Sequence, residues 1–108
     1  MTLEEAIGDA MLDSMRKIYR YARALEFLEK RPLYTREFLR TINSWGDSFE
    51  LLKELQRCGL IERYVGFCYN SRRKCIYNRV SEKGREFLSL IRKLVAMIND
   101  PYFVTKMR

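Results

Sequence analysis

Hydrophobic residues recur at steps of three and four over the first thirty positions of the chain. They are Leu3, Ile7, Met11, Met15, Ile18, Ala22, Leu25 and Leu28. This spacing places them on one side of a helix, which Pro32 is expected to end near Lys30. Because Gly8 weakens a helix, we expect residues 1–13 to form an N-terminal helical arm, which is either bent or a separate turn.

Two shorter helices separated by a turn are predicted next. Thr35 starts a helix that runs to about Ile42, and the following residues 43–46 are typical of a turn. A third helix follows near residues 46–58, and Gly59 is typical of the position after a helix end. One side of this helix is apolar and is expected to face the core: Phe49, Leu51, Leu52, Leu55 and Cys58.

A β-hairpin and a last helix complete the pattern. Residues 60–69 and 75–80 are rich in β-branched and aromatic side chains, and the polar stretch between them predicts a hairpin loop. Ser81 then caps a helix that ends near Asp100. The apolar side of that helix consists of Phe87, Leu88, Leu90, Ile91, Leu94, Val95 and Ile98.

The order helix, helix, turn, helix, hairpin, helix is that of a winged helix-turn-helix. We therefore predict an α+β fold, mostly helical, with a three-helix core and a two-stranded β wing. A chain of 108 residues has room for one such domain. Residues 14–80 would form it, and residues 81–108 would form a C-terminal dimerisation helix and tail.

Positive charge is concentrated in the second half of the chain. Residues 1–50 hold 8 basic and 9 acidic side chains, whereas residues 51–108 hold 13 basic and 5 acidic side chains. The net charge of the whole chain is +7. This segregation favours binding to a polyanion, although a net charge of this size also serves solubility alone.

Several function classes lack the residues that they need. The chain has no histidine, which excludes a histidine general base, a Ser-His triad and a histidine metal site. Its three cysteines have no Cys-x-x-Cys spacing, so we expect no metal, no cofactor and no enzymatic activity. No apolar run approaches about 18 residues, and the chain is acidic before Arg16, so we expect an intracellular, cytoplasmic protein without a membrane span.

Two of the cysteines flank the predicted hairpin loop. If the chain turns at residues 71–72, Cys68 lies directly opposite Cys75, and Phe67 lies opposite Ile76. Cysteines that face each other in this way approach to disulfide distance. Because disulfides are rare inside cells, the sequence is compatible with a disulfide and equally with two reduced thiols.

Short motifs along the chain occur in the order and at the spacing of a known family. They are Ser44-Trp45-Gly46-Asp47-Ser48-Phe49, Leu52-Lys53-Glu54-Leu55, Gly59-Leu60-Ile61, Arg72-Arg73-Lys74, Tyr77 and Ser81-Glu82-Lys83-Gly84-Arg85. Residues 20–98 thereby resemble the PadR-like group of winged-helix transcriptional regulators. That group shows Ser-x-Gly-Thr-x-Tyr, Leu-x-x-Leu, Gly-Leu-Ile and Thr-Glu-Lys-Gly-Arg at the matching places. The chain departs from the pattern at Asp47, Phe49 and Glu50.

The resemblance and the charge together imply a regulator that binds double-stranded DNA. In such a protein the helix near 46–58 enters the major groove, the second helix holds flanking phosphates, and the basic wing tip grips the backbone or the minor groove. The candidate DNA-binding residues are Arg36, Arg40, Ser44, Trp45, Asp47, Ser48, Lys53, Arg57, Arg72, Arg73 and Lys74. The sequence does not indicate a small-molecule effector.

Some of these residues also have a purely structural interpretation. Trp45 would serve as a packed turn residue, Lys53 as the ion-pair partner of Glu50, and Arg57 as that of Glu54. The tyrosines of the hairpin are expected to pack within the wing rather than to stack on bases: Tyr64, Tyr69 and Tyr77.

Acidic residues on the third helix favour a different function. Asp47 and Glu50 repel phosphate and weaken the case for tight base readout. The alternative to a specific regulator is therefore an architectural or protein-interaction winged-helix module with little sequence specificity.

Apolar residues in excess of a small core predict a homodimer. They are Leu3, Ile7 and Met11 in the arm, and Leu88, Ile91, Leu94, Val95 and Ile98 in the last helix. PadR-like proteins, which the chain resembles, pair through their last helix. The alternative is that both helices fold back and complete a monomeric core.

Overall fold

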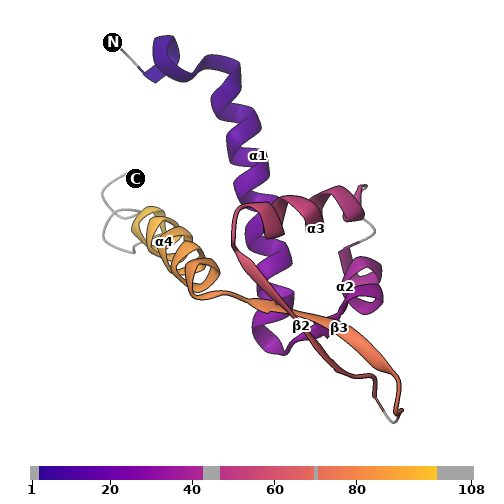
Figure 1. Cartoon of the computed structure of the whole chain (residues 1–108). Helices are drawn as coiled ribbons and strands as arrows, with labels where there is room; N and C mark the ends of the chain where they lie inside the picture. The colour runs from indigo at the N-terminus through magenta and orange to yellow at the C-terminus, as the bar shows by residue number, and fades with distance from the viewer. Residues whose placement is uncertain (1–2, 43–46, 70, 100–108) are drawn as a thin grey trace.

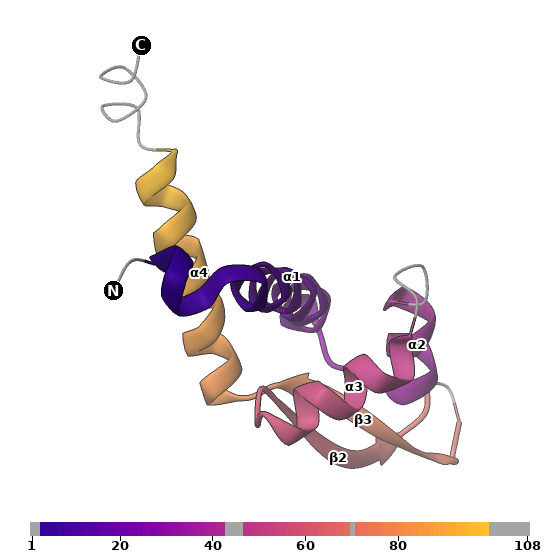
Figure 2. The same ribbon diagram turned by 90° about the horizontal axis from the view of Figure 1, so that it is seen from above.

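A computed structural model describes residues 3–42, 47–69 and 71–99, with side chains from Asp13 onward (Figure 1). The elements in chain order are α1 (Leu3–Lys30), β1 (Leu33–Tyr34), α2 (Thr35–Ile42), α3 (Ser48–Arg57), β2 (Ile61–Phe67), β3 (Lys74–Val80) and α4 (Glu82–Ile98). Strands β2 and β3 form a wing that extends away from the helices (Figures 1 and 2). This arrangement confirms the predicted winged helix-turn-helix and its mostly helical α+β class.

Helix α1 is one helix from Leu3 to Lys30 that bends close to its start (Figure 1). Residues 3–13 are therefore the first turns of α1 and not a separate turn. The expected boundary after residue 13 falls inside this helix. The helix ends before Pro32 because the residue that precedes a proline disfavours helical geometry.

The sheet has three strands, whereas the sequence predicted two. Strand β1 pairs Leu33 with Asn78 and Tyr34 with Tyr77, so the strand order is β1-β3-β2 and all pairs are antiparallel. A strand of two residues is too short to produce an alternating pattern, and for this reason periodicity did not indicate it. The buried side chain of Asn78 also holds β1, because its amide donates a hydrogen bond of 3.2 Å to the carbonyl of Leu33.

The predicted register of the hairpin is wrong by two residues. Cys75 lies opposite Gly66, and Phe67 lies opposite Lys74 rather than Ile76. The cause is the loop 68–73, which closes with a hydrogen bond of 2.8 Å from Cys68 N to Arg73 O instead of turning at residues 71–72.

Of the two states that the sequence left open for these cysteines, the structure contains the disulfide. It joins Cys68 to Cys75, whose Cα atoms are 5.3 Å apart. Cys68 directly follows β2 and pairs with Arg73 through its backbone. Its side chain therefore reaches Cys75 diagonally, two residues further along the opposite strand.

The core lies between the helices and one face of the sheet. It contains Ala24, Leu25, Leu28, Leu33, Phe38, Ile42, Leu51, Leu52, Leu55, Leu60, Ile61, Val80 and Leu88. The inward orientation of Leu51, Leu52 and Leu55 is confirmed, but that of Phe49 and Cys58 is wrong. Phe49 is 53% exposed because it lies roughly a third of a helical turn away from the buried side of α3. Cys58 is exposed because it follows the end of that helix.

Helix α4 begins at Glu82 because Ser81 caps it. The Ser81 hydroxyl accepts a hydrogen bond of 2.9 Å from Gly84 N and donates one of 2.6 Å to the carbonyl of Gly59. This brings Gly84 against the chain that enters the wing. A Cβ atom at Gly84 would overlap the carbonyl oxygen of Leu60 and would lie 2.8 Å from Val80 Cγ1.

We therefore predict that Gly84→Ala lowers the free energy of unfolding by about 1–3 kcal/mol, because backbone cannot move aside as a flexible side chain does. Helix propensity alone would instead raise the free energy of unfolding by up to about 1 kcal/mol, because alanine favours a helix more than glycine does. Chemical denaturation measures the difference. The matched control is Ser89→Ala on the exposed side of α4, with an expected change within about 0.5 kcal/mol. Equal effects of the two substitutions would contradict the close approach at Gly84.

Candidate nucleic-acid interface

The start of helix α3 is fixed by a side-chain cap. Asp47 is the N-cap residue, and its carboxylate accepts a hydrogen bond of 3.3 Å from Glu50 N. Asp47 thus has a structural task that a threonine also performs, which accounts for this departure from the PadR-like pattern. Ser48 is the first residue of the helix. Ser44 and Trp45, which the sequence placed at this helix start, lie outside the described residues.

The outer face of α3 carries the predicted polar residues. Glu50, Lys53 and Arg57 are exposed. Lys53 Nζ lies 3.6 Å from the Glu50 carboxylate and 4.7 Å above the centre of the Phe49 ring. The ion pair confirms the structural interpretation of Lys53, but an exposed pair of this kind contributes little to stability. Breaking this ion pair, so that Lys53 can bind another anion, therefore costs little free energy.

A partly buried hydrogen bond joins α3 to α1. The Tyr21 hydroxyl donates a hydrogen bond of 2.8 Å to the Glu54 carboxylate. Burial, helped by this hydrogen bond, raises the pKa of Tyr21 to about 12. The sequence indicated Arg57 as the partner of Glu54 and gave no sign of Tyr21, because a contact between residues 33 positions apart leaves no local pattern.

One face of the wing carries packed tyrosines. The ring centres of Tyr64 and Tyr77 are 5.6 Å apart in a stacked pair, and those of Tyr34 and Tyr77 are 6.2 Å apart in an edge-on pair. The Tyr77 hydroxyl donates a hydrogen bond of 2.6 Å to the carbonyl of Phe67, and its ring covers Gly66, where a Cβ atom would lie 2.9 Å away. This confirms that the wing tyrosines pack together.

Arg31 ties the wing loop to helix α2. Its guanidinium pairs with the Glu37 carboxylate at 3.0 Å, lies 5.5 Å from the centre of the Tyr69 ring and also donates to the Tyr69 hydroxyl. The wing is thus joined to α2 through its loop as well as through the sheet.

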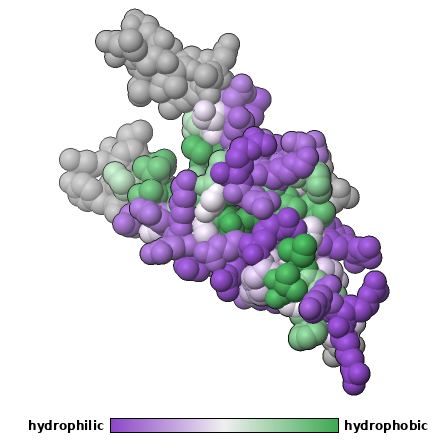
Figure 3. Space-filling model, viewed as in Figure 1, coloured by the Kyte–Doolittle hydropathy of each residue, from purple (hydrophilic) through white to green (hydrophobic). Residues whose placement is uncertain are grey.

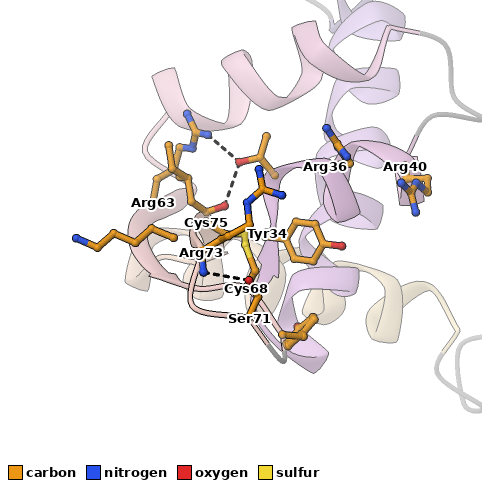
Figure 4. Close-up of a pocket in the computed structure, with 12 residues that line it drawn as sticks. Tyr34, Arg36, Arg40, Arg63, Cys68, Ser71, Arg73 and Cys75 are labelled. Carbon is orange, nitrogen blue, oxygen red and sulfur yellow. Dashed lines mark hydrogen bonds between the residues drawn. A yellow bond between two sulfur atoms is a disulfide. The ribbon is translucent and has the colours of Figure 1, made fainter.

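An open cleft of about 600 Å³ lies between α2 and the wing (Figure 4). We call it the basic cleft. Its lining includes five cationic residues, two from α2 and three from the wing: Arg36, Arg40, Arg63, Arg73 and Lys74. Four of these were predicted to bind DNA. The fifth, Arg63, was not selected, although it stands at the start of the most basic stretch of the sequence.

The remaining predicted cations do not line the basic cleft. Arg72 is exposed beside it in the wing loop, and Lys53 and Arg57 lie on α3. The tip of the wing is hydrophilic, whereas apolar side chains lie along its length (Figure 3). Val65, Phe67 and Ile76 are the exposed apolar residues of the two strands.

Arg63 is held in place at the floor of the basic cleft. Its Nε donates a hydrogen bond of 3.1 Å to the side-chain oxygen of Asn78, and its Nη2 donates one of 2.9 Å to Thr35 Oγ1. Thr35 in turn donates a hydrogen bond of 3.1 Å to the carbonyl of Ile76. The guanidinium therefore has a fixed orientation before any ligand binds.

The predicted dimer residues divide into two groups. Leu88 is 2% exposed and belongs to the core, so its assignment to an interface is wrong: it faces α1 rather than solvent. Ile91 is half-buried, whereas Leu94, Val95 and Ile98 are exposed, as are Met15, Ile18 and Tyr19 of α1. The side chains of Leu3, Ile7 and Met11 lie outside those that the structure describes.

Helices α1 and α4 cross each other (Figure 2). Arg92 joins them, with hydrogen bonds of 2.7 and 2.9 Å to the Glu29 carboxylate and an ion pair of 3.6 Å with Glu26. The hydrogen bonds from Arg92 lower the pKa of Glu29. A second cleft of about 390 Å³ runs between the two helices and is lined by Tyr19, Ala22, Leu88, Ile91 and Val95, among others.

Within residues 3–42, 47–69 and 71–99, no helix is long and apolar enough to cross a membrane. In the same part of the chain, acidic residues and cysteines do not gather into a group that could hold a metal ion.

Solved structures of transcriptional regulators share this fold. A Streptococcus transcriptional regulator matches with a TM-score of 0.63 at 15% identity, over 85% of this chain and 96% of that chain. A PadR-like transcription factor from Bacteroides fragilis matches with a TM-score of 0.62 at 20% identity, over 93% of this chain and 100% of that chain. A PadR family transcriptional regulator from Eggerthella lenta matches with a TM-score of 0.56 at 17% identity, over 93% and 88% of the two chains.

No protein-family model and no curated protein sequence matches the chain. At identities of 15–20%, the likeness to these solved structures shows that the chain shares their fold.

Proposed function

We propose that this protein is a transcriptional regulator that binds double-stranded DNA as a homodimer. The observation that carries the proposal is the convergence of cations from α2 and from the wing on the basic cleft. Duplex DNA is a dense line of negative charge, and the release of its counterions supplies most of the affinity of such surfaces. The fold supports the same function, since the solved proteins that share it are named as transcriptional regulators.

Each part of the surface has a task in this proposal. Helix α3 enters the major groove, with Lys53 and Arg57 directed at the DNA. Asp47 and Ser48 at the start of α3, and Ser44 and Trp45 that precede them in the sequence, are the residues proposed to contact the bases. Arg36 and Arg40 bind the flanking phosphates. The wing loop, with Arg72, Arg73 and Lys74, reaches the neighbouring minor groove or its backbone.

A module with little sequence specificity is the second candidate. It is favoured by Glu50, an exposed acid in the first turn of α3, and by the use of the Asp47 carboxylate as a cap rather than as a free acceptor for a base. The pairing of Glu50 with Lys53 reduces the repulsion of phosphate without adding base readout. A comparison of affinities for a selected site and for random duplex separates the two candidates.

We predict that the affinity for duplex DNA falls steeply with salt. If each chain neutralises three to five phosphates, the slope of log affinity against log salt is about −3 to −4.5 per chain. Replacing Arg72, Arg73 and Lys74 together by alanine should weaken binding and flatten the slope by about one unit for each phosphate that the variant no longer neutralises. Fluorescence anisotropy of a labelled duplex at several salt concentrations measures both quantities.

The control for this variant removes the same charge from another surface. Arg16, Lys17 and Lys30 are exposed on α1, and their joint replacement by alanine should leave the slope nearly unchanged. An unaltered affinity and slope in the wing variant would remove the wing from the DNA-binding surface. The absence of duplex binding by the unmodified protein at low salt would contradict the proposed function itself.

The homodimer is proposed to form through α1 and α4. The exposed residues Leu94, Val95 and Ile98, with Met15 and Ile18 of α1, make an apolar surface beside the cleft between these helices. Apolar surface of this kind on a small basic protein favours a partner. A two-fold dimer that binds two half-sites needs its two copies of α3 about 34 Å apart, which is one turn of DNA.

We predict that Leu94→Glu combined with Ile98→Glu converts a dimer into a monomer of 13.0 kDa. Both side chains are more than 60% exposed within one chain, so the change should not unfold the protein. Sedimentation at micromolar concentration measures the mass. Val65→Glu on the wing, which is 66% exposed, is the matched control and should remain dimeric. An unmodified protein that sediments as a stable monomer would rule out the dimer.

A further inference from the structure

Both cysteines of the disulfide line the basic cleft. The proposed function gives the disulfide no role. We propose that the basic cleft binds a phosphodiester group of the DNA backbone against Arg63, and that the Cys68–Cys75 disulfide holds the wing side of this phosphate site in place. This inference rests on the proposed function and adds to it a defined phosphate site and its means of support.

The charge of the basic cleft favours an anion. Its five cations are close enough to line one cavity, and none of the described residues that line it is a carboxylate. The acids of α2 and β2 are paired with other cations: Glu37 pairs with Arg31 at 3.0 Å, and Glu62, on the opposite face of the sheet, pairs with Arg79 at 2.9 Å. Like charges that converge without a counter-charge repel one another, and a bound phosphate relieves that repulsion.

Arg63 is the residue best prepared to bind this phosphate. Its hydrogen bonds to Asn78 and Thr35 use Nε and Nη2, which leaves Nη1 and the rest of the planar group for a ligand. Because the side chain is already ordered, it loses little conformational freedom when a phosphate binds. Figure 4 shows Arg63 and Arg73 on the wing side of the cleft and Arg36 and Arg40 on the α2 side.

The disulfide determines where two of the other cations lie. Arg73 and Lys74 belong to the segment between Cys68 and Cys75, which are seven positions apart. The same segment is held by hydrogen bonds from Cys68 N to Arg73 O and from Arg73 N to Ser71 Oγ. Without the covalent link, this loop would have to become ordered when DNA binds, and the affinity would fall by that entropy.

The test is the affinity of the full-length protein for a duplex of about 25 base pairs at two salt concentrations. Arg63→Gln should lower the affinity tenfold or more and reduce the salt slope by about one unit, as expected for one charged hydrogen-bonded phosphate contact. The matched control is Arg79→Gln, which removes the same charge from the opposite face of the same sheet. It should change the affinity less than threefold. Equal losses in both variants would overturn the phosphate site.

Two further variants keep this test independent of folding. Arg63→Lys keeps the charge but cannot form the forked hydrogen bonds of a guanidinium. Its affinity for DNA should therefore lie between those of Arg63→Gln and the unmodified protein. Arg36→Gln removes a cation from the α2 wall without touching the bonds of Asn78, and should also weaken binding. Unchanged affinity in Arg36→Gln together with a lower melting temperature in Arg63→Gln would show that Arg63 has a purely structural role.

The role of the disulfide is tested with Cys68→Ser combined with Cys75→Ser. Measured well below its melting temperature, this variant should bind DNA at least fivefold more weakly, whereas Cys58→Ser at the exposed third cysteine should bind normally. Wild-type affinity in the double variant would overturn this part of the proposal.

Inorganic phosphate distinguishes the DNA backbone from a free ion as the ligand. Saturable binding of inorganic phosphate to the DNA-free protein, lost in Arg63→Gln while DNA affinity stays unchanged, would overturn the assignment to DNA. If the unmodified protein binds no DNA at low salt, the proposed function itself fails. If it binds DNA but Arg63→Gln matches Arg79→Gln, only the present inference fails.

Discussion

The side-chain amide of Asn78 connects the parts of this protein that have to act together. It is fully buried, and a buried amide is stable only when its hydrogen-bonding groups are satisfied. Its nitrogen donates to the Leu33 carbonyl and to Thr35 Oγ1, and its oxygen accepts from Arg63. Asn78 of β3 thus forms hydrogen bonds with Leu33 of β1, with Thr35 at the start of α2 and with Arg63 of β2. The position of the wing relative to α2 depends on these bonds.

The two faces of the wing have complementary roles in this arrangement. The tyrosine face supplies packing, because Tyr64, Tyr77 and Tyr34 contact one another and Tyr77 covers Gly66. The other face and the loop carry cations whose mutual repulsion works against folding. A core this small tolerates that repulsion because the hairpin is reinforced twice, by the aromatic contacts and by the disulfide. In the function that we propose, DNA supplies the missing counter-charge.

Much of the fold could be predicted from the sequence, because its helices and hairpin obey strong local rules. The caps at Ser81 and Gly59 and the spacing of Leu51, Leu52 and Leu55 each identify an element without tertiary information. Features that depend on distant contacts could not be predicted in this way. The two-residue strand β1 exists only through its pairing with β3, and the register of the hairpin depends on the geometry of its loop.

The candidate site was less predictable than the fold for the same reason. Cations at the wing tip and on α2 stand out in a charge count, but a count does not show which of them converge. Arg63 became part of the basic cleft only through its bonds to Asn78 and Thr35, which lie 15 and 28 positions away. Leu88 was predicted to face a partner because its helical stripe continues into exposed residues, yet only the structure shows that α1 covers it.

The central claim, that two copies of this fold bind one duplex through α3 and the wing, is tested most directly by a hydroxyl-radical footprint on a duplex selected for tight binding. The account predicts two protected segments on one face of the duplex, centred about 10 base pairs apart, with protection extending into the adjoining minor grooves where the wings bind. A single protected segment, or uniform weak protection along the whole duplex, would contradict it.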